Sequence, residues 1–123
     1  MSNRVRSNPH SGDSVAFLTT SDESHGKCFR FEYRARAVTA ALPDHSHADQ
    51  VERLEVTAGR LHCRVGGELH VLAAGESLTI QPGVPHSVWN ESPEGSRTIA
   101  EFRPVGSMQA LFELAFPVPE EGD

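Results

Sequence analysis

The sequence predicts an all-β domain, a sandwich or barrel of short strands followed by one short helix. Three observations lead to this prediction. Several segments alternate apolar and polar residues with a period of two, as half-buried strands do. Glycine and proline residues separate these segments at intervals of about 8–12 residues, which is typical of sandwiches and barrels. Only the end of the chain spaces its apolar residues as a helix does.

The clearest strand is expected over residues 28–36. Phe29, Phe31 and Tyr33 share one face of that segment, and the arginine and glutamate residues between them share the other. Further strands are expected at residues 15–20, 51–56, 60–65, 70–72, 77–80, 86–89 and 98–103. A tight turn ending at Gly59 should pair strand 51–56 with strand 60–65, so that Leu54 faces residue 63.

The remaining segments complete the predicted organisation. Residues 108–116 should form a helix, with Ser107 as its N-cap and prolines 117 and 119 ending it. The first fourteen residues are mostly small, polar or charged, which predicts a mobile tail. We therefore expect a tail at 1–14, a β-domain at 15–105, and a helix with an acidic tail, frayed from residue 120, at 106–123.

Composition restricts the classes of protein to consider. The chain has 123 residues, the size of one domain, and no apolar run approaches the ~20 residues of a membrane-spanning helix. A net charge of −6 argues against a nucleic-acid partner. No secretory signal is visible, and Cys28 and Cys63 should be reduced and buried, as in a cytoplasmic protein.

The candidate functional residues begin at position 45. His45 and His47 are two residues apart in an extended segment, so their side chains should point the same way. Glu52 shares the parity of Leu54 and should therefore point inward. An inward glutamate among apolar residues is costly unless it is paired or binds a cation. His86 shares the apolar parity of its own segment and should point inward as well.

Two patterns frame these residues. The first, His-x-His-x4-Glu-x6-Gly, spans residues 45–59, and the second, Gly-x5-Gln-Pro-Gly-x2-His-x3-Asn, spans residues 75–90. Together they resemble the paired motifs of the cupin superfamily over roughly residues 30–105. Thr39 and Gln81 stand where that family usually has a glycine and a proline. The resemblance implies a small single-domain cupin, a jelly-roll barrel also called a double-stranded β-helix.

The resemblance also implies a metal site. In such a cupin, His45, His47, Glu52 and His86 would bind one divalent transition metal. Three imidazoles and one carboxylate suit Fe, Mn, Ni, Co, Cu or Zn, and this set is too rich in nitrogen for Mg or Ca. Four protein ligands leave two positions of an octahedral ion open for water, dioxygen or a bidentate substrate.

The metal site is similar to that of the quercetinase-like dioxygenases. This similarity implies a metal-dependent dioxygenase that acts on a small organic molecule, with Glu52 also serving as the catalytic base. Two other hypotheses stay open: a non-catalytic module that binds or senses a small molecule, and a sugar isomerase or epimerase. The latter needs a basic cavity for phosphate, and few basic residues are expected on the inner faces.

Some residues have roles that depend on strand register. A shift of one residue decides whether His70, Glu101 and Arg103 face the cavity. We favour a structural histidine at position 70 and surface positions for the other two, with Phe102 inside. Trp89 should point outward and pack under another strand or subunit. Together with open sheet edges and the apolar end of the chain, this predicts a homodimer.

Overall fold

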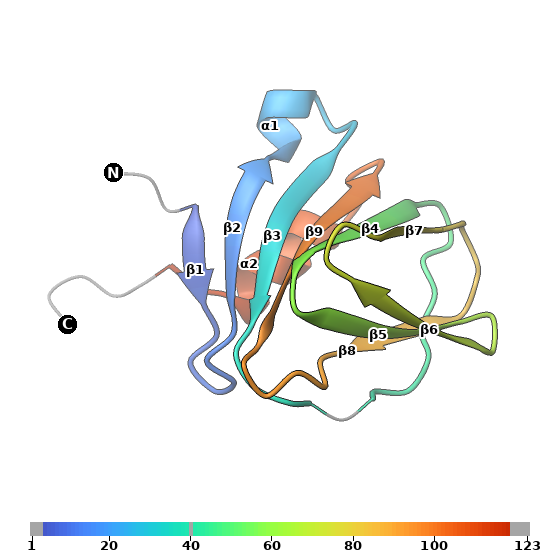
Figure 1. Cartoon of the computed structure of the whole chain (residues 1–123). Coiled ribbons are helices and arrows are strands. Elements are labelled where there is room, and N and C mark those ends of the chain that lie inside the picture. The colour runs from blue at the N-terminus through green and yellow to red at the C-terminus, as the bar shows by residue number, and fades with distance from the viewer. Residues whose placement is uncertain (1–3, 40, 119–123) are drawn as a thin grey trace, which may run out of the picture.

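Two antiparallel sheets face each other in the computed structural model of the chain, which describes residues 4–39 and 41–118 (Figure 1). The larger sheet has the order β1-β2-β3-β9-β4-β7 and the smaller one the order β6-β5-β8. This arrangement confirms the predicted jelly-roll barrel. The strands are β1 (Val5–Ser7), β2 (Ser14–Thr19), β3 (Phe29–Ala35), β4 (Val51–Ala58), β5 (Arg60–Val65), β6 (Glu68–Ala73), β7 (Ser77–Ile80), β8 (His86–Trp89) and β9 (Ser96–Arg103).

Strand β9 shows how the sequence produces the core. Its even-numbered residues are buried and point between the sheets, whereas its odd-numbered residues face outward. Phe102 is 3% exposed and stacks on Phe31 of β3, with a centroid distance of 6.2 Å. Glu101 and Arg103 lie on the outer face, where they form an ion pair with a distance of 2.9 Å. The favoured register of this strand is therefore confirmed.

Strands β4 and β5 belong to different sheets, so the predicted pairing between them is wrong. β4 pairs with β9 and β7, whereas β5 pairs with β6 and β8. Gly59 joins them with a φ of +74°, and a Cβ there would lie 2.6 Å from the carbonyl oxygen of Gly95. Leu54 and Cys63 are both buried as predicted. Alternation specifies which face of a strand is buried, but it leaves the partner strand open.

The N-terminal segment contains a strand that the prediction of a mobile tail missed. β1 pairs with β2 at the edge of the larger sheet, and Asn8 donates a hydrogen bond to the carbonyl oxygen of Ala115 at 2.8 Å. Three residues are too few to show alternation, and polar residues surround them. From residue 4 onward this segment is part of the fold, whereas residues 1–3 lie outside the described residues.

Two helices complete the described chain, α1 (Ser21–Ser24) and α2 (Met108–Ala115). α2 confirms the predicted C-terminal helix, although the Ser107 side chain makes no capping hydrogen bond. Phe112 packs on Phe31 with a centroid distance of 4.4 Å, so α2 covers the inner face of β3. The acidic tail predicted over residues 120–123 lies outside the described residues. Neither helix is long and apolar enough to cross a membrane.

Candidate metal centre and cavity

Three histidines meet at one end of the barrel. His86 opens β8, and His45 and His47 lie on the segment that leads to β4. The backbone amide of His45 donates to the carbonyl oxygen of His86 at 2.9 Å, and the amide of His86 donates to the carbonyl oxygen of His45 at 2.8 Å. This bridge docks the segment onto the strand. One ring nitrogen from each histidine lies within 4.8 Å of the others, so the three could bind one ion.

Glu52 completes the cluster from β4. Its Oε1 lies 3.0 Å from Nε2 of His86 and 3.4 Å from Nε2 of His47. All three atoms are buried, yet none makes a well-oriented hydrogen bond to a described residue. Unsatisfied buried polar atoms are costly, and a divalent cation between them would satisfy all three. The structure thus brings together all four residues that the motifs implied.

The electrostatics of the cluster also suit a cation. Burial raises the pKa of Glu52, but its contacts with His47 and His86 outweigh that effect and lower the pKa overall. Burial lowers the pKa of His86, but the nearby Glu52 carboxylate and the hydrogen bond with the carbonyl oxygen of Val84 raise it overall. The 2.9 Å contact between Nδ1 of His86 and Val84 leaves Nε2 facing Glu52. Glu52 therefore supplies a carboxylate charge at the centre of the histidines.

A cavity of about 550 Å³ lies between the two sheets and extends to Glu52. This volume is in the range of about 300–1,000 Å³ that small-molecule sites occupy. Apolar side chains from both sheets form most of its wall, among them Phe31, Leu54, Leu61, Val88, Ala100 and Phe102. Among the described residues that line it there is no lysine or arginine. The cavity therefore suits a largely apolar molecule better than a phosphorylated one.

Residues 35–100, more than half of the chain, match the family model of the cupin domain. The chain belongs to the cupin family. Over 76 residues, or 62% of its length, this cupin is 32% identical to quercetin 2,3-dioxygenase of Bacillus subtilis, and it spans 23% of that enzyme. The motif-based recognition of the family is therefore confirmed.

Solved structures support the fold of this cupin. It matches an RmlC-like cupin from Shewanella frigidimarina with a TM-score of 0.69 at 21% identity, over 85% of this chain and 86% of that one. It also matches a predicted oxalate decarboxylase from Thermotoga maritima with a TM-score of 0.68 at 17% identity, over 75% and 80% of the two chains. At these identities the likeness concerns the barrel alone.

Arg64 of this cupin braces the cluster from the outer face of the smaller sheet. Its Nε donates to Oδ1 of Asp44 at 2.9 Å, and its Nη2 donates to Oγ of Ser87 at 3.2 Å. Asp44 directly precedes His45 and Ser87 directly follows His86, so one guanidinium ties together the backbones that carry two of the histidines. The role of Arg64 was not predicted, because nothing in the sequence links this residue to a position 20 residues earlier.

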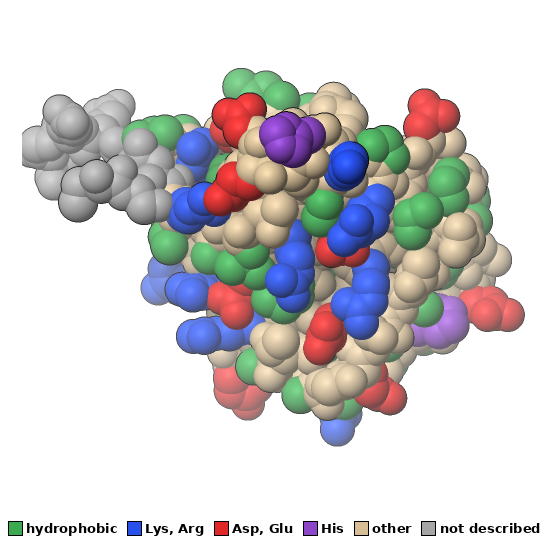
Figure 2. Space-filling view, turned by 90° about the horizontal axis from the view of Figure 1, so that it is seen from above, with side chains coloured by type: hydrophobic (Ala, Val, Ile, Leu, Met, Phe, Trp, Pro, Cys, Tyr) green, Lys and Arg blue, Asp and Glu red, His purple; other side chains and the backbone are tan. Residues whose placement is uncertain are grey.

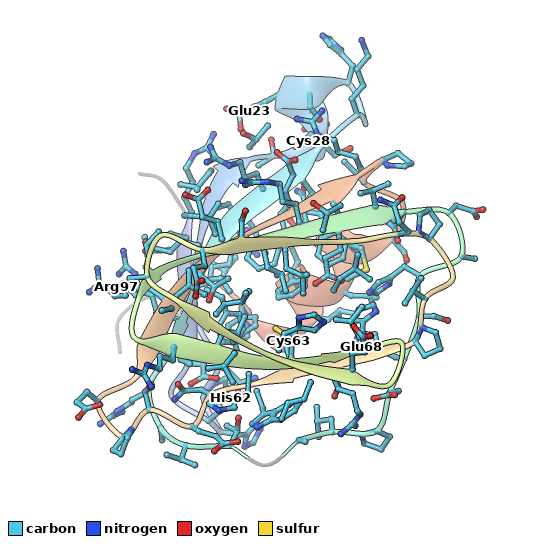
Figure 3. All side chains as sticks on the ribbon, turned by 45° about the vertical axis from the view of Figure 1, so that its right-hand side comes forward. Glu23, Cys28, His62, Cys63, Glu68 and Arg97 are labelled. Atoms are coloured by element: carbon cyan, nitrogen blue, oxygen red, sulfur yellow. The ribbon has the colours of Figure 1, made fainter. Side chains whose placement is uncertain are left out.

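Trp89 lies on the outer face of β8, as predicted, but side chains of the same chain cover its ring. The ring of His62 lies 5.9 Å away between centroids, and the guanidinium of Arg64 lies 5.7 Å from the ring centre. Its Nε1 donates to Glu91 at 2.6 Å. Figure 3 shows His62 on the outside of the barrel and its neighbour Cys63 on the inside. A partner subunit is not needed to explain this tryptophan.

His70 lies on the inner side of the smaller sheet but outside the histidine cluster. Gly66 and Gly67 form a two-residue turn, which places His70 opposite the buried Cys63. Its side chain is 34% exposed, and its Nε2 lies 3.7 Å from Glu68. It is not one of the three histidines whose ring nitrogens converge. This position makes His70 a useful control for the three that do.

Basic side chains gather outside the barrel. Figure 2 shows lysine and arginine residues on the face that carries α1. A second hollow of about 550 Å³ lies there, and its basic residues are Lys27, Arg30, Arg53 and Arg103. Glu23 and Glu101 line it too and neutralise part of this charge. The positive charge that a phosphate would need therefore lies on the outer face of the larger sheet, away from Glu52.

Proposed function

We propose that this cupin is a metal-dependent oxidoreductase of the dioxygenase type that acts on a small, largely apolar organic molecule. The observation that carries the proposal is the position of Glu52. This residue belongs both to the histidine cluster and to the wall of the apolar cavity. A molecule held in the cavity would therefore lie next to a metal held by the cluster. The sequence likeness to a quercetin dioxygenase supports the same class of chemistry.

Within this proposal, His45, His47, Glu52 and His86 hold one divalent transition metal, either Fe, Mn, Ni, Co, Cu or Zn. The unsatisfied buried atoms of His47, Glu52 and His86 support that assignment. When bound, the ion would act as a Lewis acid on a substrate oxygen and, where it is redox-active, as an electron conduit. His45 is exposed, whereas His86 is 1% exposed, so the cluster runs from solvent to the barrel interior.

Glu52 is the proposed catalytic base. Its lowered pKa keeps it ionised at neutral pH, so it can accept a proton from a substrate hydroxyl. The only other carboxylate among the described residues of the cavity wall is Asp13. Phe102 lies opposite Glu52 on the neighbouring strand β9, and Leu54 lies two residues further along β4 on the same face. Both side chains are buried and shield the carboxylate of Glu52 from water.

Oxygen consumption tests the proposed function. The protein, reconstituted with each metal in turn, would be supplied with a panel of flavonols and enediols. We expect oxygen uptake with at least one flavonol and with at least one redox-active metal. Saturable binding without oxygen uptake would contradict the enzyme and favour a binding or sensing module. The sugar isomerase hypothesis has less support, because no lysine or arginine is found among the described residues of the cavity wall.

We also propose a cytoplasmic homodimer without a nucleic-acid or membrane partner. Three exposed leucine and valine side chains support a dimer: Leu111 and Leu114 on α2 are 52% and 80% exposed, and Val5 on the edge strand β1 is 56% exposed. Light scattering at micromolar concentration should give twice the 13.4 kDa mass of the chain. Leu114→Glu should shift the population toward the monomer. A 13.4 kDa species for the unmodified protein would contradict the proposal.

Arg64→Met should weaken metal binding by about 10–100-fold, the usual effect of losing a residue that orients metal ligands. Methionine keeps much of the apolar stem but loses the contacts with Asp44 and Ser87. The affinity would be measured by competition with a chromogenic chelator. Arg60→Met is the matched control, since Arg60 lies on the same face of β5 and is exposed. Equal affinities for the two variants would show that Arg64 does not position the cluster.

A further inference from the structure

The apolar cavity has a second polar end. Asp13 and Tyr33 line the same cavity as Glu52. Oη of Tyr33 donates to Oδ2 of Asp13 at 2.6 Å, and the backbone amide of Arg36 donates to Oδ1 at 2.9 Å. Asp13 is 5% exposed, so this carboxylate is buried although it belongs to the N-terminal segment.

Strand register separates the two polar ends. On β9, Phe102 is the partner of Glu52, and Thr98 is the partner of Tyr33. Four residues of extended strand span about 13 Å. Ala100 lies between them on the inner face of β9 and pairs with Phe31. A molecule that reaches from one end to the other is therefore elongated and apolar in its middle.

The hydrogen bond between Tyr33 and Asp13 determines which of their groups remain available to a ligand. Burial, followed by the hydrogen bond to Asp13, raises the pKa of Tyr33, so its hydroxyl stays protonated at neutral pH. That proton is already donated to Asp13. On Asp13 and Tyr33, the groups left for a ligand are the lone pairs of the Tyr33 Oη atom and of the Asp13 carboxylate, and both are acceptors.

We propose that Asp13 and Tyr33 form a substrate subsite that accepts a hydrogen bond from a hydroxyl group at the far end of an elongated, apolar molecule. This inference rests on the proposed use of the cavity as the substrate pocket. A methyl ether at the same position cannot donate and leaves buried acceptors unsatisfied. A terminal carboxylate adds repulsion from Asp13. The N-terminal segment thereby selects the substrate at the end opposite to Glu52.

Three biphenyls, titrated into the metal-free protein, test the subsite apart from metal chemistry: 4-hydroxybiphenyl, 4-methoxybiphenyl and biphenyl-4-carboxylate. None of them chelates a metal as an enediol would. Calorimetric titration of the full chain should show the phenol binding about tenfold more tightly than its methyl ether, the scale of one hydrogen bond to a charged acceptor. The carboxylate should bind most weakly. Equal binding of phenol and ether, or no binding of any biphenyl, would overturn the subsite.

Two variants then show which end of the cavity causes the preference for the phenol over its methyl ether. In Asp13→Asn, the amide oxygen can still accept from Arg36 and the amide nitrogen can donate to Tyr33, which frees the Tyr33 proton for the ligand. The tenfold preference for the phenol should fall to about onefold, because the subsite now donates. In Glu52→Gln, the preference should persist. If it disappears in Glu52→Gln, the hydroxyl binds at the metal end and the proposal is wrong, even where Asp13→Asn does not fold.

The biphenyl titration and the oxygen-uptake assay can succeed or fail independently of each other. Biphenyl selectivity depends on Asp13 and Tyr33 and needs no oxygen chemistry. Oxygen uptake with flavonols depends on the metal cluster. A selective cavity without oxygen uptake would therefore support the subsite while contradicting the dioxygenase, and oxygen uptake with an unselective cavity would do the reverse.

Discussion

Glu52→Gln should lower turnover by about 100-fold or more, the scale of a lost acid–base group, while metal occupancy falls only in part. Glutamine keeps the shape of the side chain and one oxygen that can bind a metal. It loses the negative charge beside His86 and His47, and it cannot accept a proton. Three imidazoles remain to hold the ion. The two effects should therefore separate when metal content and oxygen consumption are measured on the same preparation.

Glu55→Gln is the matched control for this variant. Glu55 lies on the same strand, but it faces outward, its side chain is 39% exposed, and it pairs with Arg53. We expect wild-type activity and metal content for Glu55→Gln. Full activity of Glu52→Gln would show that the base lies elsewhere and that Glu52 acts as a ligand at most. An equal loss of metal and activity would assign the whole effect to metal binding.

His86→Ala should weaken metal binding by more than about 100-fold while the barrel stays folded. Loss of a residue that merely orients a ligand already costs about 10–100-fold, and here a ligand itself is removed. The barrel persists because its stability comes from the apolar core, in which Phe29, Phe31 and Val56 are at most 2% exposed. The wild type should carry about one transition metal per chain by elemental analysis. Circular dichroism of both proteins would report the fold.

His70→Ala provides the comparison for His86→Ala. His70 also lies on the inner side of the smaller sheet, but its ring is outside the cluster. We expect wild-type metal content for His70→Ala and the same loss for His47→Ala as for His86→Ala. A wild-type protein that takes up no transition metal on reconstitution would overturn the metal site as a whole. Metal retained by His86→Ala but lost by His70→Ala would mean that the cluster is centred elsewhere.

Sequence alone indicated which side of strand β4 is buried. Glu52, Leu54 and Val56 share one parity, and all three are buried. The same alternation favoured Phe102 on the inside, and the resemblance to the cupin motifs implied that His45, His47 and His86 are partners of Glu52. These inferences held because strand side chains alternate strictly and because a buried carboxylate needs a counter-charge. Both are local properties of the chain.

Tertiary structure alone decided which segments lie next to each other. The turn at Gly59 carries the chain from one sheet to the other, so β4 and β5 do not pair. Arg64 reaches Asp44 across 20 positions, and Tyr33 reaches Asp13 across 20 positions as well. Neither contact has a periodic signature, since each depends on the packing of separate strands and loops. The contact of Arg64 behind the histidines and the Asp13–Tyr33 pair at the far end of the cavity therefore could not be predicted from the sequence. Only folding brings these distant side chains within hydrogen-bond distance.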